Sequence, residues 1–373
     1  MRATAVLPVV NGDTREALRD LLRRLLREQL VQAVMVPRRM AQGHVVTASL
    51  VVNPAELDTA DPLAAVMPVQ SARLVARLSS AGGAGRVAVV IRSCEWRALV
   101  ELVKLKQASL DNLLTIGVDC LGTYEMNDYL QLCADGGDPG MELLSGALHG
   151  RDAPRSGHAL RTACSMCEHP VAEGADMVVQ LVGWDTQQSI GLEAPEPVLS
   201  ALHLRMAPVN SEREHAVATL TQSRLAMRAR LLAEYRARVN DAESFAQEYA
   251  ACTGCHNCMV ACPICYCLEC IFRGATFRHS SADYLARVAR QGVLRLPADI
   301  LLFHLTRMNH MATSCVGCGL CTSACPVGLP VATAFRAVAG EVQALFDYLP
   351  GRSVEEPLPL SIFREEELTH FGS

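Results

Sequence analysis

Residues 252–263 read Cys-Thr-Gly-Cys-His-Asn-Cys-Met-Val-Ala-Cys-Pro, and this stretch decides the fold of the C-terminal part of the chain. Its spacing, Cys-x2-Cys-x2-Cys-x3-Cys-Pro, returns at residues 315–326. Three thiolates two residues apart can surround a [4Fe–4S] cluster from one tight loop, whereas the fourth starts a segment that points away. When two such runs occur together, the fourth cysteine of each ligates the other cluster. The repeat therefore predicts two [4Fe–4S] clusters.

The predicted ligands follow from this exchange of the fourth cysteine. One cluster takes Cys252, Cys255, Cys258 and Cys325, and the other takes Cys315, Cys318, Cys321 and Cys262. Structural zinc is the alternative, but zinc normally takes one pair of Cys-x2-Cys or Cys/His elements. Residues 263–314 are longer than the connection of a minimal ferredoxin and contain a helical pattern at 298–313. We therefore expect helices, and not a small β-sheet, to hold the two clusters.

Eight further cysteines have to be explained, because the chain has 16 cysteines in 373 residues, well above ordinary usage. A chain of this length buries a full core and needs no disulfide staples. Cys94 and Cys120 each follow a short apolar run, at the carboxyl end of a predicted strand, where α/β sheets place ligands. The pair Cys164 and Cys167 could close over the same crevice. These four cysteines predict a third [4Fe–4S] cluster, with buried or free thiols as the alternative.

The last four cysteines have no assigned role. Cys265, Cys267 and Cys270 follow the first run directly, and with Cys133 they would make four ligands, but no spacing rule joins them. We favour packed or surface thiols over a further metal site. The nearby histidines are interpreted as core or surface residues: His256, His304 and His310.

Residues 1–210 alternate helical and strand-like patterns, which is typical of an α/β domain. Helices are predicted at 14–30 and 95–107, and strands at 31–37, 44–52, 87–91, 114–118 and 177–182. We therefore predict an α/β domain at 1–210, a mainly α-helical two-cluster ferredoxin-like domain at 211–350 and a surface tail at 351–373.

The helical domain opens with a long helical pattern from 211 to 250. Five apolar residues are predicted to face inward: Val217, Leu220, Leu225, Leu232 and Val239. The arginines are predicted to lie mostly on the opposite face, in contact with solvent: Arg224, Arg228, Arg230, Arg236 and Arg238.

Composition and charge exclude several classes of protein. The net charge of −5 argues against a dedicated nucleic-acid partner, because phosphate binding relies on an excess of Lys and Arg. No run of 18 apolar residues is present to cross a bilayer, and the N-terminus lacks the apolar segment of a signal peptide. A cytoplasmic location is therefore predicted, where so many thiols indicate metal or redox chemistry.

Several stretches resemble the beta subunits of coenzyme F420-reducing hydrogenase and of F420-linked formate dehydrogenase. The residues that carry the resemblance are 87–95, 116–120 and 161–167, with Ala175-Asp176 and Gly183. Residues 262–270 and 303–308 look most like the formate dehydrogenase branch, and the two-cluster region is also similar to the small subunit of heterodisulfide reductase. The resemblance covers most of the chain. It implies FAD and a cluster in the α/β domain, with Cys94, Cys120, Cys164 and Cys167 matching scattered cysteines of the family.

Two hypotheses about function follow. In the first, the chain is an iron–sulfur and flavin subunit of an oxidoreductase that passes electrons between a catalytic formate dehydrogenase or hydrogenase subunit and a carrier such as F420 or NAD. In the second, it is a flavin-free iron–sulfur subunit that links such an enzyme to a heterodisulfide-reductase-like complex. Residues 66–69 and Ser93 depart from the family pattern, which leaves the second hypothesis open. A zinc-dependent nucleic-acid module is a third interpretation, against which the negative charge weighs.

Overall fold

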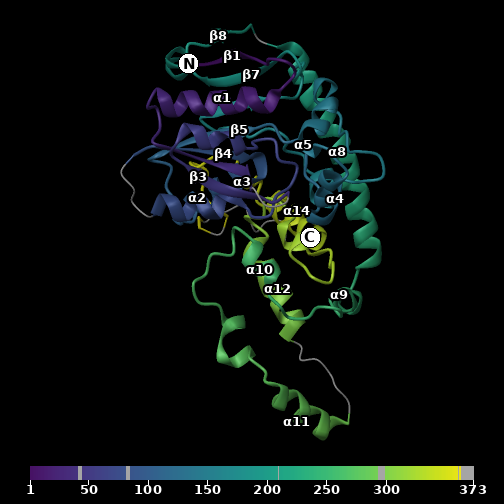
Figure 1. Cartoon of the computed structure of the whole chain (residues 1–373). Coiled ribbons are helices and arrows are strands. Elements are labelled where there is room, and N and C mark those ends of the chain that lie inside the picture. Colours follow the sequence, from purple (N-terminus) through teal and green to yellow (C-terminus); the bar gives the residue numbers. More distant parts are fainter. Residues whose placement is uncertain (41–43, 81–84, 209, 293–298, 360, 363–373) are drawn as a thin grey trace.

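A computed structural model describes residues 1–40, 44–80, 85–208, 210–292, 299–359 and 361–362. It has a mixed eight-stranded sheet in the N-terminal part and a helical part that follows it (Figure 1). The strands are β1 (Arg2–Pro8), β2 (Ala33–Arg39), β3 (Val46–Val51), β4 (Val87–Arg92), β5 (Leu113–Val118), β6 (Met177–Gln180), β7 (Ser189–Pro195) and β8 (Arg205–Met206). Their order in the sheet is β3-β2-β4-β5-β6-β7-β1-β8. The predicted fold class is confirmed.

The centre of the sheet is parallel and its margins are antiparallel. Strands β2, β4, β5 and β6 run parallel to one another, while β3 at one side and β7, β1 and β8 at the other pair antiparallel. Parallel strands align their carboxyl ends at one edge of the sheet. The segments that follow β4 and β5 therefore begin side by side.

Helices cover both faces of this sheet. In the N-terminal part they are α1 (Thr14–Arg27), η1 (Pro54–Thr59), α2 (Ser71–Ser80), α3 (Ser93–Lys104), α4 (Met126–Ala134), α5 (Pro139–Glu142), η2 (Leu143–His149), α6 (Thr162–Ser165) and α7 (Glu196–Ala201). Helix α1 packs on one face, and α2 and α3 pack on the other (Figure 1). Along β4, Ala88 and Val90 join the core under α1, whereas Val89 and Ile91 join the core under α2 and α3.

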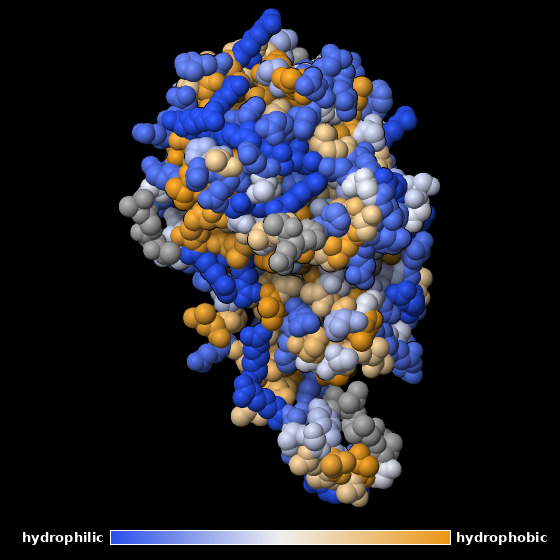
Figure 2. Space-filling model, in the orientation of Figure 1, coloured by the Kyte–Doolittle hydropathy of each residue, from blue (hydrophilic) through white to orange (hydrophobic). Residues whose placement is uncertain are grey.

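The C-terminal part is built from helices. They are α8 (Ser211–Arg238), α9 (Ala242–Glu248), α10 (Asn257–Ala261), η3 (Ile271–Arg273), η4 (Ala275–Phe277), α11 (Ser281–Gln291), α12 (Asp299–Met311), α13 (Leu320–Ser323) and α14 (Val331–Leu345). The segment that carries α11 projects from the main body, and no residue of α11 is buried (Figures 1 and 2). In the described part of the chain, no helix is long and apolar enough to span a membrane.

The prediction for residues 211–250 was wrong in two respects. The helical pattern ends at Arg238 and a new helix starts after Asp241, whose side chain accepts a hydrogen bond from the backbone N–H of Ser244. The inward face also differs, because Arg224 is 1% exposed whereas Leu225 is 39% exposed. Arg224 lies on the line of Leu220 along the helix, and it is held there by Asp152 (Nη2–Oδ1 2.7 Å).

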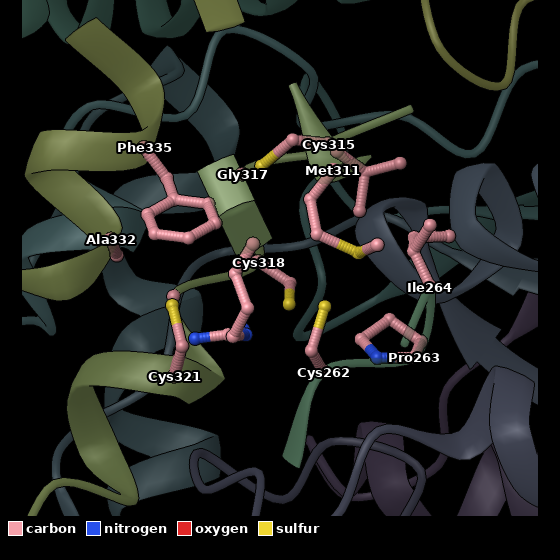
Figure 3. A pocket seen from close by; sticks show the side chains of 13 residues that line it. Cys262, Pro263, Ile264, Met311, Cys315, Gly317, Cys318, Cys321, Ala332 and Phe335 are labelled. Carbon is pink, nitrogen blue, oxygen red and sulfur yellow. The ribbon is translucent and has the colours of Figure 1, made fainter. Parts of the chain in front are cut away.

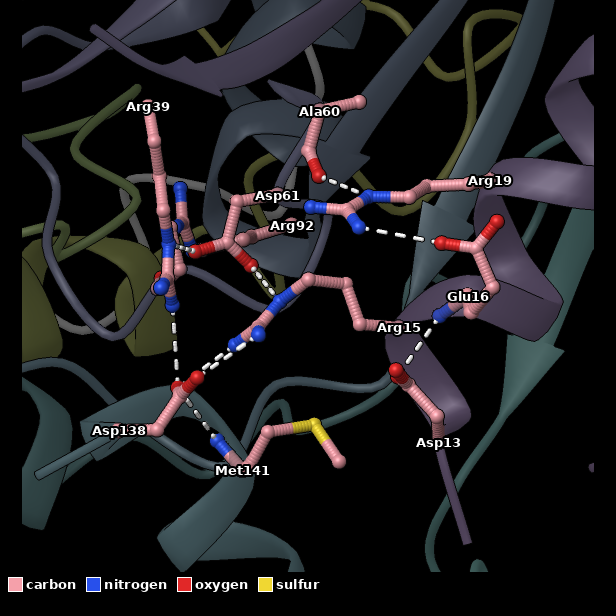
Figure 4. Close-up of polar contacts among 11 residues, drawn as sticks. Asp13, Arg15, Glu16, Arg19, Arg39, Ala60, Asp61, Arg92, Asp138 and Met141 are labelled. Atoms are coloured by element: carbon pink, nitrogen blue, oxygen red, sulfur yellow. Dashed lines mark hydrogen bonds and ion pairs between the residues drawn. The ribbon is translucent and has the colours of Figure 1, made fainter. Parts of the chain in front are cut away.

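A buried ion-pair network holds α1 against the sheet (Figure 4). The carboxylate of Asp61, which is 0% exposed, accepts hydrogen bonds from Arg15 Nε at 2.8 Å and from Arg39 Nε at 2.7 Å. Asp138 pairs with Arg15 (Nη2–Oδ1 2.6 Å). Burial alone would raise the pKa of Asp138, but hydrogen bonds and charge from Arg15 and Arg39 lower it to about 2. The Asp138 carboxylate therefore stays ionised at neutral pH.

Removing the buried charge of Asp61 should destabilise the protein strongly. We expect Asp61→Asn to lower the free energy of unfolding by about 3–5 kcal/mol, because Arg15 and Arg39 lose the more deeply buried of the two carboxylates that they share. Asp20→Asn is the matched control, since Asp20 pairs with Arg23 (Oδ1–Nη1 2.6 Å) but is 55% exposed. It should cost less than about 1 kcal/mol. Anaerobic urea denaturation followed by circular dichroism measures both, and equal effects would contradict this account of the network.

Candidate metal centres

One group of cysteines surrounds a cavity in the helical part (Figure 3). Cys262 comes from the end of the first run, and Cys315, Cys318 and Cys321 come from the second. Burial raises the pKa of the Cys318 thiol to about 12, and the neighbouring thiols of Cys262 and Cys315 contribute to this. Apolar side chains complete the wall, among them Ile264, Met311 and Phe335. We call these four cysteines the inner group.

A second group joins the other half of each run. Burial raises the pKa of the Cys258 thiol, and the nearby Cys252, Cys255 and Cys325 thiols add to the effect while Arg307 opposes it. The backbone N–H of Leu329 points at Cys325 Sγ, with the two atoms 3.4 Å apart. Cys255 is exposed to solvent, whereas Cys258 is buried. We call Cys252, Cys255, Cys258 and Cys325 the outer group.

The structure also brings the four scattered cysteines together at the carboxyl edge of the sheet. Cys94 lies in the first turn of α3 directly after β4, Cys120 follows β5, and Cys164 and Cys167 lie in and after α6. Burial raises the pKa of Cys120 to about 11, and the charge of the Cys164 thiol adds to the effect. For Cys94, whose pKa burial also raises, the contributing thiols include Cys318, Cys120 and Cys167. We call Cys94, Cys120, Cys164 and Cys167 the sheet-edge group.

Arginines surround the sheet-edge group. They are the buried Arg97, Arg161 and Arg224 and the partly buried Arg92, and each is near at least two of its cysteines. Arg224 pairs with Asp152 and also donates from Nη1 to the carbonyl of Cys120 at 3.2 Å. Arg97 donates to the carbonyls of Pro350 and Val316, and its Nη2 has no partner. Among the described residues, no carboxylate forms an ion pair with Arg97.

Burial lowers the pKa of Arg97, because the interior disfavours its positive charge. Cys167 is the neighbour that favours the charged form most. A buried cation with no ion-paired carboxylate is the property of this site that sequence reasoning missed. An arginine within the apolar pattern of residues 93–104 was the available signal.

The sheet-edge group and the inner group lie against each other. Arg161, which precedes Cys164, donates from Nη2 to the carbonyl of Cys318 at 3.1 Å and from Nε to Ser323 Oγ at 3.0 Å. Gly319 has φ +75, and a Cβ atom added to it would lie 2.2 Å from the Cβ atom of Ala163. Only a glycine at 319 therefore permits this close approach.

The remaining cysteines and histidines are distributed as follows. Cys133 is buried beside Tyr129 in the core under α1, whereas Cys265 and Cys270 pack against the other apolar core, so Cys133 does not join Cys265, Cys267 and Cys270. Burial raises the pKa of Cys265 to about 11, with Cys262, Cys267 and Cys270 nearby.

Within the described residues, no three His, Cys, Asp or Glu side chains converge closely enough for a single metal ion. The histidines differ in exposure: His304 is buried, His256 is half-buried and His310 is exposed.

Comparison with known proteins adds to this geometry. Residues 248–329 match the model of the 4Fe-4S dicluster domain. The beta subunit of the F420-dependent formate dehydrogenase of Methanocaldococcus jannaschii is 25% identical over 92% of this chain and 93% of its own length. The beta subunit of F420-dependent formate dehydrogenase 1 of Methanococcus maripaludis is 25% identical over 73% of this chain and 74% of its own. Among solved structures, a chain of the F420-reducing [NiFe] hydrogenase complex of Methanosarcina barkeri has a TM-score of 0.45 and 12% identity, covering 65% of this chain and 94% of that one.

The cysteine groups and the family match define an iron–sulfur protein of the 4Fe-4S dicluster type over residues 248–329, joined to a mixed eight-stranded α/β sheet. The chain is homologous, along nearly its whole length, to the beta subunits of F420-dependent formate dehydrogenases. The resemblance expected from the sequence is thereby confirmed.

Gly319 offers a test of the contact between the sheet-edge group and the inner group. We expect Gly319→Ala to cost about 1–2 kcal/mol for the left-handed backbone and a further 1–3 kcal/mol for the overlap with Ala163. Gly328→Ala is the matched control, because its φ is +68 and nothing lies within 4 Å of the added Cβ atom. It should show the backbone cost alone. Anaerobic thermal or urea unfolding compares the two variants, and equal losses would show that the close contact is absent.

Proposed function

We propose that the chain is an electron-transfer subunit that holds three [4Fe–4S] clusters and a flavin. It passes electrons between a catalytic formate dehydrogenase or hydrogenase subunit and a carrier such as coenzyme F420 or NAD. The observation that supports this most is the row formed by the three cysteine groups. The sheet-edge group adjoins the inner group through Cys94 and Cys318, and the outer group shares both cysteine runs with the inner group.

The cysteines of each group are suited to hold a cluster. In the outer cluster the ligands would be Cys252, Cys255, Cys258 and Cys325, and in the inner cluster Cys262, Cys315, Cys318 and Cys321. The inner cavity is walled by apolar side chains, and backbone N–H groups approach the sulfurs, as at Leu329 and Cys325. Such clusters accept and donate single electrons at potentials that the surrounding hydrogen bonds and solvent exposure set.

The third cluster, held by Cys94, Cys120, Cys164 and Cys167, is supported by the charge of its surroundings. With protonated thiols, the nearby negative charge for Arg97 would be that of Glu168, which already pairs with Arg228 and Arg336, and a buried cation without its own partner costs several kcal/mol. Four thiolates on an iron–sulfur cluster bring net negative charge to that position. The buried arginines therefore favour a cluster over four free thiols.

A flavin site is supported by a cleft between the sheet domain and the cluster domain. Its walls are Val66, Met67 and Pro68 on one side, residues 124–127 on a second, and residues 320–328 on the third. The cleft has a volume of about 530 Å³, within the range of cofactor pockets, and Arg161 and Cys325 both line it. A flavin bound there would adjoin the outer group. Flavin exchanges two electrons with a hydride carrier and single electrons with clusters.

One observation favours the flavin-free alternative, in which the chain links an enzyme to heterodisulfide-reductase-like subunits. The wall at residues 66–68 is Val-Met-Pro and offers no polar side chain to the phosphates of a dinucleotide. Both versions use the exposed Cys255 end of the row as the place where a partner subunit exchanges electrons, because the other two groups have no exposed cysteine. The cytoplasmic location expected from the sequence stays a prediction.

Flavin content separates the two versions. Anaerobically purified protein should release about one FAD per chain on acid extraction, and after dithionite reduction it should reduce F420 or NAD. Asn127→Trp should lower the FAD content by filling the cleft while leaving the iron content unchanged, because Asn127 is exposed and belongs to none of the three cysteine groups. Val10→Trp, at an exposed position outside the cleft, is the control. Iron without any flavin in the unaltered protein would overturn the flavin proposal and leave the flavin-free subunit.

A further inference from the structure

Helix α12 passes between the outer and the inner cysteine groups and presents one cation to both. Arg307 is 4% exposed. Its Nη1 donates to Cys258 Sγ at 3.1 Å and its Nη2 donates to the carbonyl of Cys258 at 3.1 Å. The same side chain lines the cavity of the inner group, beside Cys262 and Cys321.

The Arg307 guanidinium is held in place without a carboxylate. It lies 5.4 Å from the ring centroid of Phe303 and 5.1 Å from that of Phe335, within the range of cation–π contacts. In the part of the chain that the structure describes, no Asp or Glu pairs with it, and its Nε has no partner. The charged neighbours that favour its positive charge are Cys258, Cys262, Cys321 and Cys265. Arg307 is therefore placed as a shared counter-charge for the thiolates of two groups.

His304 lies one helical turn before Arg307 and reaches one group alone. Its Nε2 is 3.4 Å from Cys252 Sγ, and its ring stacks on Tyr249 with the centroids 3.9 Å apart. His304 is 1% exposed and does not line the cavity of the inner group. The ring is thus fixed so that a single nitrogen faces a single sulfur.

A hydrogen bond or a positive charge at a ligating thiolate stabilises the reduced cluster, which carries one more negative charge, and so raises its reduction potential. In the dry interior this effect is large, because little water screens it. The two side chains of α12 therefore act on different clusters, because Arg307 contacts both cysteine groups whereas His304 contacts the outer group alone.

We propose that Arg307 is a positioning residue that raises the reduction potentials of both clusters of the dicluster domain, whereas His304 raises that of the outer cluster alone. The inference rests on the ligand assignments of the proposed function. Helix α12 thereby sets both the average potential of the pair and the difference between its members. Through His304, the reduction potential of the outer cluster is set independently of that of the inner cluster.

The test is redox titration of the anaerobically purified full chain, followed by electron paramagnetic resonance. The outer cluster is identified by relaxation enhancement from an added dysprosium chelate, because Cys255 is exposed. For Arg307→Gln we expect the ratio of reduced to oxidised cluster at a fixed potential to fall about tenfold at both clusters, a shift of 59 mV in each. For His304→Phe, which keeps the stacking on Tyr249, we expect the ratio of reduced to oxidised cluster to fall at the outer cluster alone.

Two further variants keep the outcome decisive. If Arg307→Gln loses iron, Arg307→Lys replaces it in the test. This variant retains the positive charge, so both clusters should keep reduction potentials close to those of the unaltered protein. Arg290→Gln removes an exposed arginine of α11 and should change neither potential. Unchanged potentials in Arg307→Gln with full iron, or a shift at one cluster alone, would overturn the inference. An unaltered protein with no [4Fe–4S] signal would instead overturn the proposed function.

Discussion

Buried positive charge needs a counter-charge, and in this chain cysteines stand where carboxylates usually do. Arg97 beside the sheet-edge group and Arg307 between the other two groups both lie in the interior with no ion-paired Asp or Glu among the described residues. Arg161 and Arg224 have carboxylate partners, but they too point at cysteines or at their backbone carbonyls. Because four free thiols carry no charge, this arrangement supports the proposal that the thiols are ionised on a cofactor.

The two parts of the chain also share an apolar core. Residues of α3 and of the sheet face beneath it, such as Leu99 and Ile91, pack in one continuous apolar cluster with Phe303, Val316 and Phe335 of the helical part. The chain after α14 returns to the same helix, where Tyr348 donates to the buried carboxylate of Glu101 at 2.6 Å. The sheet-edge group therefore keeps a fixed position against the inner group.

Much of the fold was predictable because its signals are local. The cysteine runs have a spacing that few other sites share, and the short apolar runs before Cys94 and Cys120 fixed the strands and their carboxyl ends. What could not be predicted depends on contacts between distant residues. Arg224 was expected to face solvent because its charge is usually exposed, yet Asp152 and the carbonyl of Cys120 hold it inside. Arg97 and Arg307 likewise lie in apolar helical patterns where sequence alone does not show a buried cation.

We propose that the sheet-edge cysteines hold a third cluster that begins the row. Total iron and acid-labile sulfide, measured per chain in the anaerobically purified protein, test this proposal. We expect about 12 iron and 12 sulfide. Cys94→Ser should lose about 4 of each, whereas Cys133→Ser, which alters a buried thiol outside all three groups, should lose none. About 8 iron in the unaltered protein, unchanged in Cys94→Ser, would contradict the third cluster and leave the buried charge of Arg97 without its explanation.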